Sequence, residues 1–477
     1  MKIKCSAWGD LDIPGNQPSP AQFHLVSNER KAHRKAPLLD ILGSVDKMRI
    51  GRPSGPAVPP CRFLFNSPRE AFLAHPKVLA LILAGGKGER LFPLTSFRSK
   101  PAVPFGGRHR IVDFVLSNFI NSHIYSIYLL IQYKSQSIIE HVRKNWSFSS
   151  VVKDHFVTIV PPQMSVGPEW FQGTSDAVYQ NINLIKDYNT DLVIVFGADH
   201  IYRMDIRQMI DFHLNNEAYV TVAARPVPLE QAPAFGVIVT DKENRITAFQ
   251  EKPRHPNPMP GDSSRTFVSM GNYIFRTDVL IDVLVKAVQK KEHDFGAHVI
   301  PSLVGTGKVF AYDFESNVIP GIKPYEEKGY WRDVGTIAAY FNAHMDMLSD
   351  KPAFDAFNSQ WPINPSWYEG PPTMIFDGQI KNSLIAEGSI IKKAKLRNSI
   401  IRSGVTIEDG ASVDECIIMD RVTIGKGCRL HRVIVDKLNV IRDGDQIGFD
   451  PDKDRFRCHI DQTSGVAIIP RAGMMAP

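Results

Sequence analysis

The C-terminal part of this sequence repeats with a period of 17 residues, and this period constrains the fold more than any other feature. Three rows of apolar residues and one row of glycines advance by the same step. The rows are Ile390, Ile407, Ile424 and Ile441; Leu396, Val413, Leu430 and Ile447; Leu384, Ile401, Ile418 and Val435; and Gly410, Gly427 and Gly444. Three apolar rows with one shared period predict a parallel β-helix. Each turn of such a helix has three short faces and packs on the next turn. An antiparallel sheet with evenly spaced strands is disfavoured, because four coils keep one period.

The part before the repeat alternates between strand-like and helix-like segments. Apolar, partly β-branched runs typical of buried strands occupy residues 78–83, 126–131, 192–196 and 220–224. Amphipathic patterns typical of helices occupy residues 111–121, 176–186 and 337–348. Strand–helix alternation predicts an α/β domain built on a doubly wound, mostly parallel sheet.

These textures divide the chain into five segments. We expect a proline-rich, basic and largely unstructured extension with one short helix near 38–42, an α/β domain, a linker rich in proline and tryptophan, the β-helix and a tail. Their predicted bounds are 1–76, 77–350, 351–377, 378–465 and 466–477. The extension holds ten of the 34 prolines, which supports its assignment as unstructured.

Charge and cysteine content exclude several classes of protein. The net charge of +6 comes from residues 1–77, which hold 12 basic and 6 acidic residues, while the rest of the chain is balanced. A basic segment without interleaved aromatic residues is typical of a solvated tail. The five cysteines form no close pair, no apolar run approaches the ~18 residues of a membrane span, and no signal-peptide pattern opens the chain. We therefore expect a cytoplasmic protein that binds neither nucleic acid nor membrane.

A glycine-rich turn follows the first predicted strand directly, in the sequence Ala-Gly-Gly-Lys-Gly-Glu-Arg at 84–90. Glycines at this point of an α/β sheet let the backbone approach a ligand, and the amides there can bind phosphate. Three cations, Lys87, Arg90 and Lys100, would suit a triphosphate. The turn matches neither the Walker loop nor the dinucleotide fingerprint, and a tight turn in a solvated loop is the alternative.

Two acids and one lysine are candidates for the remaining chemistry. Asp199 follows the strand at 192–196, and Asp333 lies just before a predicted helix. Carboxylates at the carboxyl edge of such a sheet suit Mg²⁺, although either acid could instead be a helix N-cap. Lys252 would neutralise a sugar phosphate, and its alternative is a surface lysine before the turn residue Pro253.

Several sequence blocks closely resemble the ADP-glucose pyrophosphorylases of glycogen and starch synthesis, and the resemblance covers about 78–470. The blocks are 81–90, 99–107, 110–121, 173–177, 197–202, 249–253 and 330–336, together with Ser269-Met270-Gly271 and Asp294-Phe295-Gly296. The resemblance implies a Rossmann-like nucleotidyltransferase domain, a left-handed β-helix, and formation of ADP-glucose and diphosphate from ATP and glucose 1-phosphate. It also implies Mg²⁺, a homotetramer, and regulation by sugar-phosphate or nucleotide effectors.

The resemblance also implies roles for individual residues. Catalysis falls to Arg90, Lys100, Asp199 and Lys252. The nucleotide would be bound by Leu83, Gly85, Gly86, Gly88, Gln132, Gly173, Thr174 and Asp176. Glucose 1-phosphate would be bound by Gly197, Glu251, Lys252, Ser269, Tyr273 and Asp333, and the metal by Asp199 and Asp333. The sequence departs from the family at Phe97, where many bacterial relatives carry a lysine linked to activator binding.

The implied nucleophile is a phosphate oxygen of glucose 1-phosphate. This oxygen is already ionised at neutral pH, so no general base is required.

Three other functions are compatible with parts of the sequence. A pyrophosphorylase could use UTP or dTTP instead. A catalytically silent regulatory subunit should have lost the charged residues named above, which are all present. A β-helix acyltransferase usually needs a catalytic histidine in the coils, where His431 is the candidate, flanked by Arg429 and Arg432.

Overall fold

The protein is described by a computed structural model that covers residues 76–148, 152–163, 167 and 169–472. The predicted unstructured extension, apart from its last residue, and the short helix near 38–42 lie outside the described residues. Among the helices of the described part, none has the length and apolar character needed to cross a bilayer.

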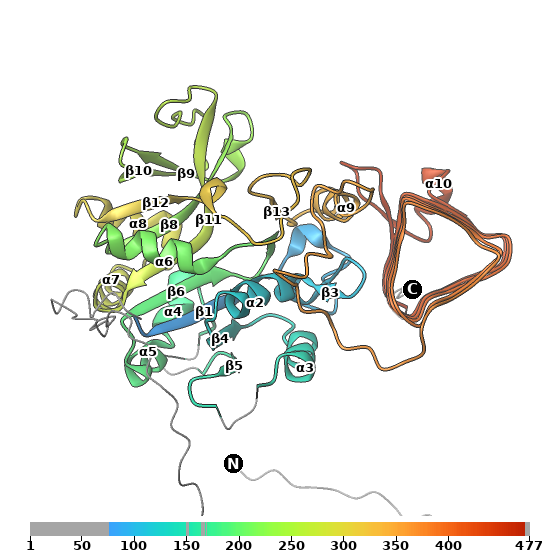
Figure 1. Ribbon diagram of the computed structural model, residues 1–477, viewed down its shortest axis with the longest axis horizontal. Coiled ribbons are helices and arrows are strands. Elements are labelled where there is room, and N and C mark those ends of the chain that lie inside the picture. The colour runs from blue at the N-terminus through green and yellow to red at the C-terminus, as the bar shows by residue number, and fades with distance from the viewer. Residues whose placement is uncertain (1–75, 149–151, 164–166, 168, 473–477) are drawn as a thin grey trace, which may run out of the picture. The chain divides into compact units, whose positions relative to one another are not determined.

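A nine-stranded mixed sheet forms the core of the first domain (Figure 1). Its strand order is β10-β9-β11-β6-β1-β4-β5, with β8 joining β11 to β12. The strands are β1 (Val78–Ala84), β4 (Ser126–Ile131), β5 (Phe156–Val160), β6 (Leu192–Gly197), β8 (Val220–Pro228), β9 (Gly236–Thr240), β10 (Ile246–Glu251), β11 (Arg265–Arg276) and β12 (Val309–Asp313). Because β6, β1, β4 and β5 are parallel neighbours, their carboxyl ends meet at one edge.

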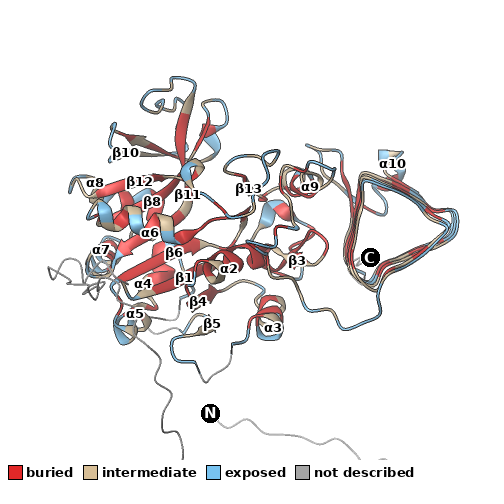
Figure 2. Ribbon diagram, viewed as in Figure 1, coloured by how far each residue is buried: buried red, intermediate tan, exposed pale blue. Residues whose placement is uncertain are grey.

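Helices cover both faces of this sheet. One face carries α2 (Ile111–Asn121), α3 (Gln136–Asn145) and α6 (Ile206–Asn215); the other carries α4 (Thr174–Tyr179), α5 (Ile182–Tyr188), α7 (Thr277–Gln289) and α8 (Ile300–Val304). Strand β1 sends Leu79 and Leu81 into one core and Ala80 and Ile82 into the other, and all four are fully buried (Figure 2). The doubly wound architecture is therefore confirmed.

The predicted helix at 176–186 is instead two helices, α4 and α5. Asn181 between them adopts a non-helical conformation (φ −114°, ψ 21°) and its side-chain amide donates to the carbonyl of Ala177 at 2.8 Å. A side chain that satisfies the backbone in this way competes with helix continuation. The break was not visible in the apolar periodicity.

A small two-stranded ribbon lies beside the main sheet. It pairs β7 (His200–Tyr202), directly after β6, with β13 (Trp331–Asp333) in antiparallel register. This register places Asp333 opposite His200. The ribbon thereby brings two distant parts of the chain to the carboxyl edge of β6. Helix α9 (Ile337–Met345) follows and ends earlier than predicted.

The C-terminal domain is a parallel β-helix with three flat faces, which is seen end-on as a triangle in Figure 1. The first face consists of β14 (Met374–Phe376), β17 (Ile390–Lys392), β20 (Thr406–Ile407), β23 (Thr423–Ile424) and β26 (Val440–Ile441). The second consists of β15 (Gln379–Lys381), β18 (Lys395–Arg397), β21 (Ser412–Asp414), β24 (Arg429–His431) and β27 (Gln446–Ile447). The third consists of β16 (Leu384–Ile385), β19 (Ile400–Ile401), β22 (Ile417–Ile418), β25 (Val433–Val435), β29 (Ala467–Ile469) and β28 (His459–Ile460), with α10 (Pro451–Asp454) inserted before β28.

The register corrects the start of two predicted apolar rows. Ile407 pairs with Ile391 rather than with Ile390, and Ile401 pairs with Ile385 rather than with Leu384. The step from β17 to β18 is one residue shorter than the corresponding steps from β20 to β21 and from β23 to β24, so the inward position shifts by one. The β-helix also exceeds its predicted bounds, since β14 lies in the predicted linker and β29 in the predicted tail.

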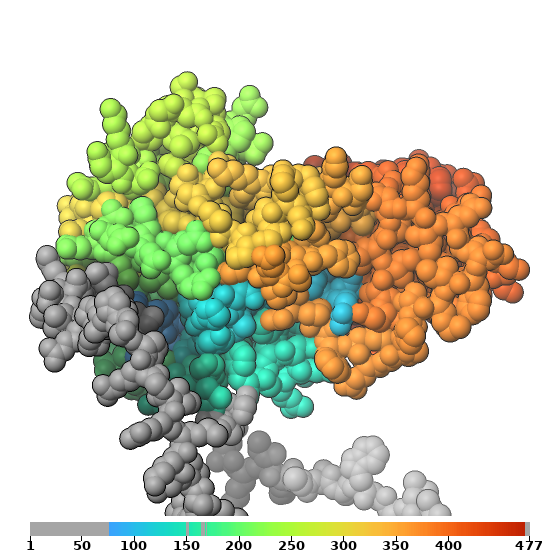
Figure 3. Space-filling model, viewed as in Figure 1, coloured from blue at the N-terminus to red at the C-terminus, as the bar shows by residue number. Residues whose placement is uncertain are grey.

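The two domains share an apolar cluster. Leu91, Leu94 and Val103 of the first domain pack with Ile434 and Ile468 of the β-helix, and all five are buried. Figure 3 shows the atoms of the β-helix lying directly against those of the first domain. The segment after the glycine-rich turn therefore lies between the carboxyl edge of the sheet and the β-helix.

Candidate active site

A cavity of about 860 Å³ opens at the carboxyl edge of the sheet. This size is within the range of small-molecule sites. It is lined by 15 of the predicted site residues: Leu83, Gly85, Gly86, Gly88, Arg90, Lys100, Gln132, Gly173, Thr174, Gly197, Asp199, Glu251, Ser269, Tyr273 and Asp333. Asp176 and Lys252 do not line it.

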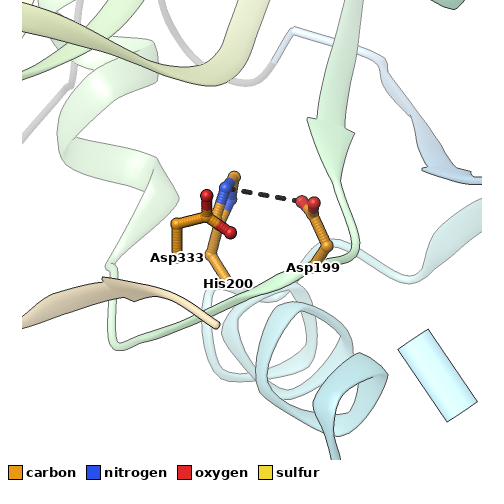
Figure 4. A group of neighbouring side chains, drawn as sticks. All are labelled: Asp199, His200 and Asp333. Atoms are coloured by element: carbon orange, nitrogen blue, oxygen red, sulfur yellow. Dashed lines mark ion pairs between the residues drawn. The ribbon is translucent and has the colours of Figure 1, made fainter. Parts of the chain in front are cut away.

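Asp199 and Asp333 meet in this cavity together with His200. One ligand atom from each residue lies within 4.8 Å of the others, and Figure 4 shows the three side chains converging, with a dashed line marking the ion pair between His200 and Asp199. The pairing of β7 with β13 explains the meeting, because it places Asp333 opposite His200. Neither acid is a helix N-cap, since Asp199 leads into a strand and the cap of α9 is Thr336.

Lys100 lies between the two acids. Its Nζ is 3.0 Å from Asp199 Oδ2 and 2.8 Å from Asp333 Oδ1, and only 8% of its side chain is exposed. Burial alone would lower the pKa of Lys100, but the charges of Asp199 and Asp333 outweigh it and raise the pKa above its usual value. Lys100 is therefore a fixed positive charge at pH 7.

Gly88 lets the glycine-rich turn pack on Lys100. It adopts a left-handed conformation (φ +66°), and an added Cβ would lie 2.9 Å from Lys100 Cβ. Both features favour glycine at this position. The turn can therefore lie directly against the Lys100 side chain.

Asp199 stays ionised in this setting. Burial tends to raise the pKa of its carboxyl, but His200 and Lys100 lower it well below its usual range. His200 Nε2 lies 3.4 Å from Asp199 Oδ1, and the His200 ring packs on Trp331 with a centroid distance of 4.8 Å. The acid therefore presents a carboxylate to the cavity.

The two carboxylates fit a hard divalent cation. Asp199 exposes 40% and Asp333 26% of its side chain, and both line the cavity. Mg²⁺ is typically bound by one or two carboxylates and completes its shell with phosphates and water. The acids of this pocket match that donor set and leave room for substrate oxygens.

Arg90 approaches Asp333 from the glycine-rich turn. Gly335 lies between them, and an added Cβ there would be 2.9 Å from both Arg90 Nη2 and Asp333 Oδ1. The cavity therefore has a cationic wall, formed by Arg90 and Lys100, beside its pair of acids.

Asp176 supports the pocket instead of lining it. Its Oδ2 accepts from the backbone N–H of Gln172 and from the side chain of Gln180, both at 2.8 Å. The acid is buried, in the first turn of α4. It fixes the turn that carries Gly173 and Thr174, which do line the cavity.

Lys252 lies just outside the cavity. Its Nζ pairs with Glu251 Oε1 at 3.0 Å, and 63% of its side chain is exposed. Glu251 does line the cavity, so the pair is at the rim. The exposed ammonium group has no other ion-pair partner within the described residues.

Other lining residues were not singled out from the sequence. They include His200, Phe171, Phe249, Asp294, Trp331 and Gly335. Asp294 accepts a hydrogen bond from Thr174 Oγ1 at 3.0 Å. The sequence blocks that carry the family resemblance contain five of them, His200, Phe249, Asp294, Trp331 and Gly335. A sequence block does not show which way a side chain points, so the sequence alone assigned these residues no role.

The β-helix histidine is engaged elsewhere. His431 Nδ1 lies 3.1 Å from Asp414 Oδ2, and Asp414 also pairs with Arg397. His431 does not line the cavity. Phe97, the residue in the position of the family lysine, is 52% exposed and contacts the guanidinium group of Arg471.

Comparisons with known proteins agree with this architecture. A family model for nucleotidyl transferases matches residues 79–350, and one for the GlmU-like C-terminal hexapeptide matches residues 373–469. A glucose-1-phosphate adenylyltransferase of Thermodesulfovibrio yellowstonii is 67% identical over 398 residues, covering 83% of this chain and 97% of the relative. Those of an Anaeromyxobacter species and Corynebacterium jeikeium are 45% and 44% identical, covering 84% and 82% of this chain and 100% and 97% of the relatives.

The chain belongs to the glucose-1-phosphate adenylyltransferase family.

Membership of the glucose-1-phosphate adenylyltransferase family confirms the resemblance and makes the chain a nucleotidyltransferase. The hexapeptide match agrees with a left-handed parallel β-helix. The acyltransferase interpretation is disfavoured, since the described cavity lies in the nucleotidyltransferase domain.

Proposed function

We propose that this chain joins ATP and α-D-glucose 1-phosphate to give ADP-glucose and diphosphate. The observation that carries the proposal is the meeting of Asp199 and Asp333, bridged by Lys100, in a cavity with a glycine-rich wall. The relatives' name, glucose-1-phosphate adenylyltransferase, supports the choice of both substrates.

The reaction needs two anionic substrates to approach each other. A phosphate oxygen of glucose 1-phosphate attacks the α-phosphorus of ATP, and the bond from this phosphorus to the bridging oxygen breaks. The electron pair of that bond leaves with diphosphate. No proton is transferred in this step, so the pocket's task is to position and neutralise negative charge.

We assign the nucleotide to the glycine-rich side of the cavity. The backbone amides of Gly85, Gly86 and Gly88 would hold phosphate oxygens, and Arg90 and Lys100 would balance the charge of the triphosphate and the leaving diphosphate. Leu83, Gln132, Gly173 and Thr174 would contact the base, with Asp176 fixing the turn that carries the last two.

We assign glucose 1-phosphate to the opposite side. The proposed contacts are Gly197, Glu251, Ser269, Tyr273 and Asp333, all of which line the cavity. Burial raises the pKa of Tyr273, so its hydroxyl stays a neutral group that can donate a hydrogen bond. Lys252 at the rim would turn from Glu251 to the substrate phosphate.

Mg²⁺ is the proposed cofactor, held by Asp199 and Asp333. When bound it would supply positive charge at the reacting phosphates. Asp199 would be an ionised ligand, and Lys100 would neutralise part of the charge at the pair of acids.

We further propose a cytoplasmic, effector-regulated homotetramer that supplies glycogen or starch synthesis. The resemblance in sequence supports regulation by a sugar phosphate or a nucleotide. A contact between copies is supported by the first coil, where the apolar side chains of Met374, Ile375 and Phe376 are about half exposed. The mass of the purified protein by light scattering tests the tetramer.

The test of the proposed reaction is diphosphate release by the purified chain with glucose 1-phosphate and ATP, UTP or dTTP in turn, with Mg²⁺ present. We expect ADP-glucose, identified by mass spectrometry, and at least tenfold lower rates with the other two nucleotides. A higher rate with UTP or dTTP would show that this nucleotide, and not ATP, is the substrate. Absence of product with every nucleotide would support a silent regulatory subunit.

A further inference from the structure

One buried ion pair connects the β-helix to the segment that carries Lys100. The Nη2 group of Arg98 lies 2.8 Å from Oδ1 and 2.7 Å from Oδ2 of Asp436. Asp436 directly follows β25 of the β-helix. The exposed fractions of the two side chains are only 4% and 1%. The pair is therefore shielded from solvent, where a charge that loses its partner is strongly disfavoured.

Arg98 and Lys100 are parts of one short, buried segment. Ser99 between them is fully buried, and its carbonyl accepts from the backbone of Ala102 at 3.0 Å. The turn at 100–102 contains Pro101, which further restricts the backbone. Because the backbone between them is short and restricted, a displacement of Arg98 would also displace Lys100.

Lys100 needs a defined position because it contacts two acids at once. Its Nζ reaches Asp199 and Asp333 at 3.0 Å and 2.8 Å. Asp199 directly precedes β7 and Asp333 is the last residue of β13, whereas Lys100 comes from the segment against the β-helix. On its other side that segment contacts the β-helix through Asp436 and Met419, whose Sδ lies 4.0 Å from Arg98 Nη1.

We propose that Asp436 is a positioning residue for the active site: by fixing Arg98, it holds Lys100 between Asp199 and Asp333. The β-helix then completes the catalytic arrangement of the other domain in addition to packing on it. This inference rests on the proposed function, in which Lys100 neutralises charge in the reaction.

The interface offers a matched control in Asp420. It is also a β-helix acid, and it pairs with Arg402 at 3.0 Å and with Lys437 at 2.9 Å. Arg402 binds backbone carbonyls of Phe105, Gly106 and His109 in the first domain, beyond the Lys100 turn. Asp420→Asn therefore weakens the same interface without removing the partner of Arg98.

The first experiment compares Asp436→Asn with Asp420→Asn in steady-state kinetics of ADP-glucose formation. We expect Asp436→Asn to lower kcat by about tenfold or more, because a displaced catalytic group costs rate steeply. The KM values for both substrates should change less than about threefold, since the other binding groups are untouched. Asp420→Asn should keep kcat within about twofold to threefold.

The second experiment asks whether Asp436 acts through Lys100. If it does, adding Asp436→Asn to Lys100→Ala changes kcat by less than about twofold, because the group it positions is already gone. Multiplicative losses, or equal losses in the Asp420→Asn and Asp436→Asn variants, would overturn the proposal. Inactive wild-type protein would instead count against the proposed function itself.

Two further measurements keep the test decisive if a variant folds poorly or is too slow to assay. The pair Arg98→Met with Asp436→Leu removes both charges and fills their space; we expect it to fold and still show the loss of kcat, and wild-type kcat would contradict the proposal. Mn²⁺ titration without substrates is independent of turnover. Lys100→Ala should tighten Mn²⁺ binding by removing a competing cation, Asp436→Asn should shift it in the same direction, and Asp420→Asn should not. A shift in Asp420→Asn equal to that in Asp436→Asn would also count against the proposal.

Discussion

Lys100 and Asp333 form an ion pair of 2.8 Å although 233 positions separate them in the sequence. The same ammonium group reaches Asp199 at 3.0 Å. Two acids this close would repel each other without an intervening cation. The lysine therefore lets the described fold present both carboxylates in one cavity.

Removal of the Asp199 carboxylate tests its catalytic role. We expect Asp199→Asn to lower kcat by about 10²- to 10³-fold, the usual cost of losing one charge-stabilising group in an active site. The melting temperature should stay near that of the wild type. Asp241→Asn, in the β9–β10 turn outside the cavity, should keep full activity. A near-normal kcat in Asp199→Asn would remove this acid from the mechanism.

Gly88→Ala tests the packing of the glycine-rich turn on Lys100. The new Cβ would lie 2.9 Å from Lys100 Cβ in a left-handed backbone, so we expect a loss of about 1–3 kcal/mol in the free energy of unfolding. Gly86→Ala is the matched control, since nothing lies within 4 Å of its added Cβ. Urea unfolding of both variants provides the comparison. Equal stabilities would show that the turn is looser than described.

Lys252→Ala tests the assignment of the rim cation to glucose 1-phosphate. Loss of a charge-assisted hydrogen bond of about 1.5–3 kcal/mol corresponds to roughly a 10- to 100-fold higher KM for this substrate. The KM for ATP should change little. If only the KM for ATP rises, Lys252 belongs to the nucleotide side instead.

Acid sensitivity should depend on buried histidines. His344 is fully buried, and desolvation lowers its pKa to about 3. Its Nε2 accepts from the backbone N–H of Gly106 at 3.1 Å, which requires the neutral ring. The unfolded chain binds a proton at this residue below about pH 6.5, whereas the folded chain does not until about pH 3. As the pH decreases between these values, His344 therefore lowers the free energy of unfolding by about 1.4 kcal/mol per pH unit.

His344→Gln should remove the contribution of one proton, about 1.4 kcal/mol per pH unit, from that slope. Glutamine can accept the hydrogen bond from Gly106 without titrating. Urea unfolding between pH 7 and pH 5 measures it. An unaltered slope in His344→Gln would assign the acid sensitivity to other groups, such as His109 and His213, whose pKa values burial lowers to about 4.

The sequence was sufficient to predict the main architecture and to place Asp199 at the carboxyl edge of the sheet. The 17-residue period determines inward positions, and strand ends determine which loops share an edge, so Asp199 and the glycine-rich turn could be placed together. The meeting with Asp333 followed from the family resemblance, and its physical cause is the pairing of β7 with β13. No local pattern indicates that pairing.

Details that depend on side-chain direction could not be predicted. Lys100 was expected near phosphates, but its bridge between Asp199 and Asp333 depends on packing against the β-helix. Asp176, which the resemblance assigns to the nucleotide, bonds to Gln172 and Gln180 outside the cavity lining. One residue fewer at the corner between β17 and β18 shifted two predicted rows, because a period averaged over several coils does not reveal a shorter corner in one of them.

The most direct test of the account is the number of Mn²⁺ ions bound per chain in the presence of ADP-glucose, measured from the electron paramagnetic resonance signal of free Mn²⁺. We predict a site in the wild type that is lost or weakened at least tenfold in both Asp199→Asn and Asp333→Asn and kept in Asp241→Asn. Undiminished Mn²⁺ binding in the first two variants would contradict a cation site shared by Asp199 and Asp333.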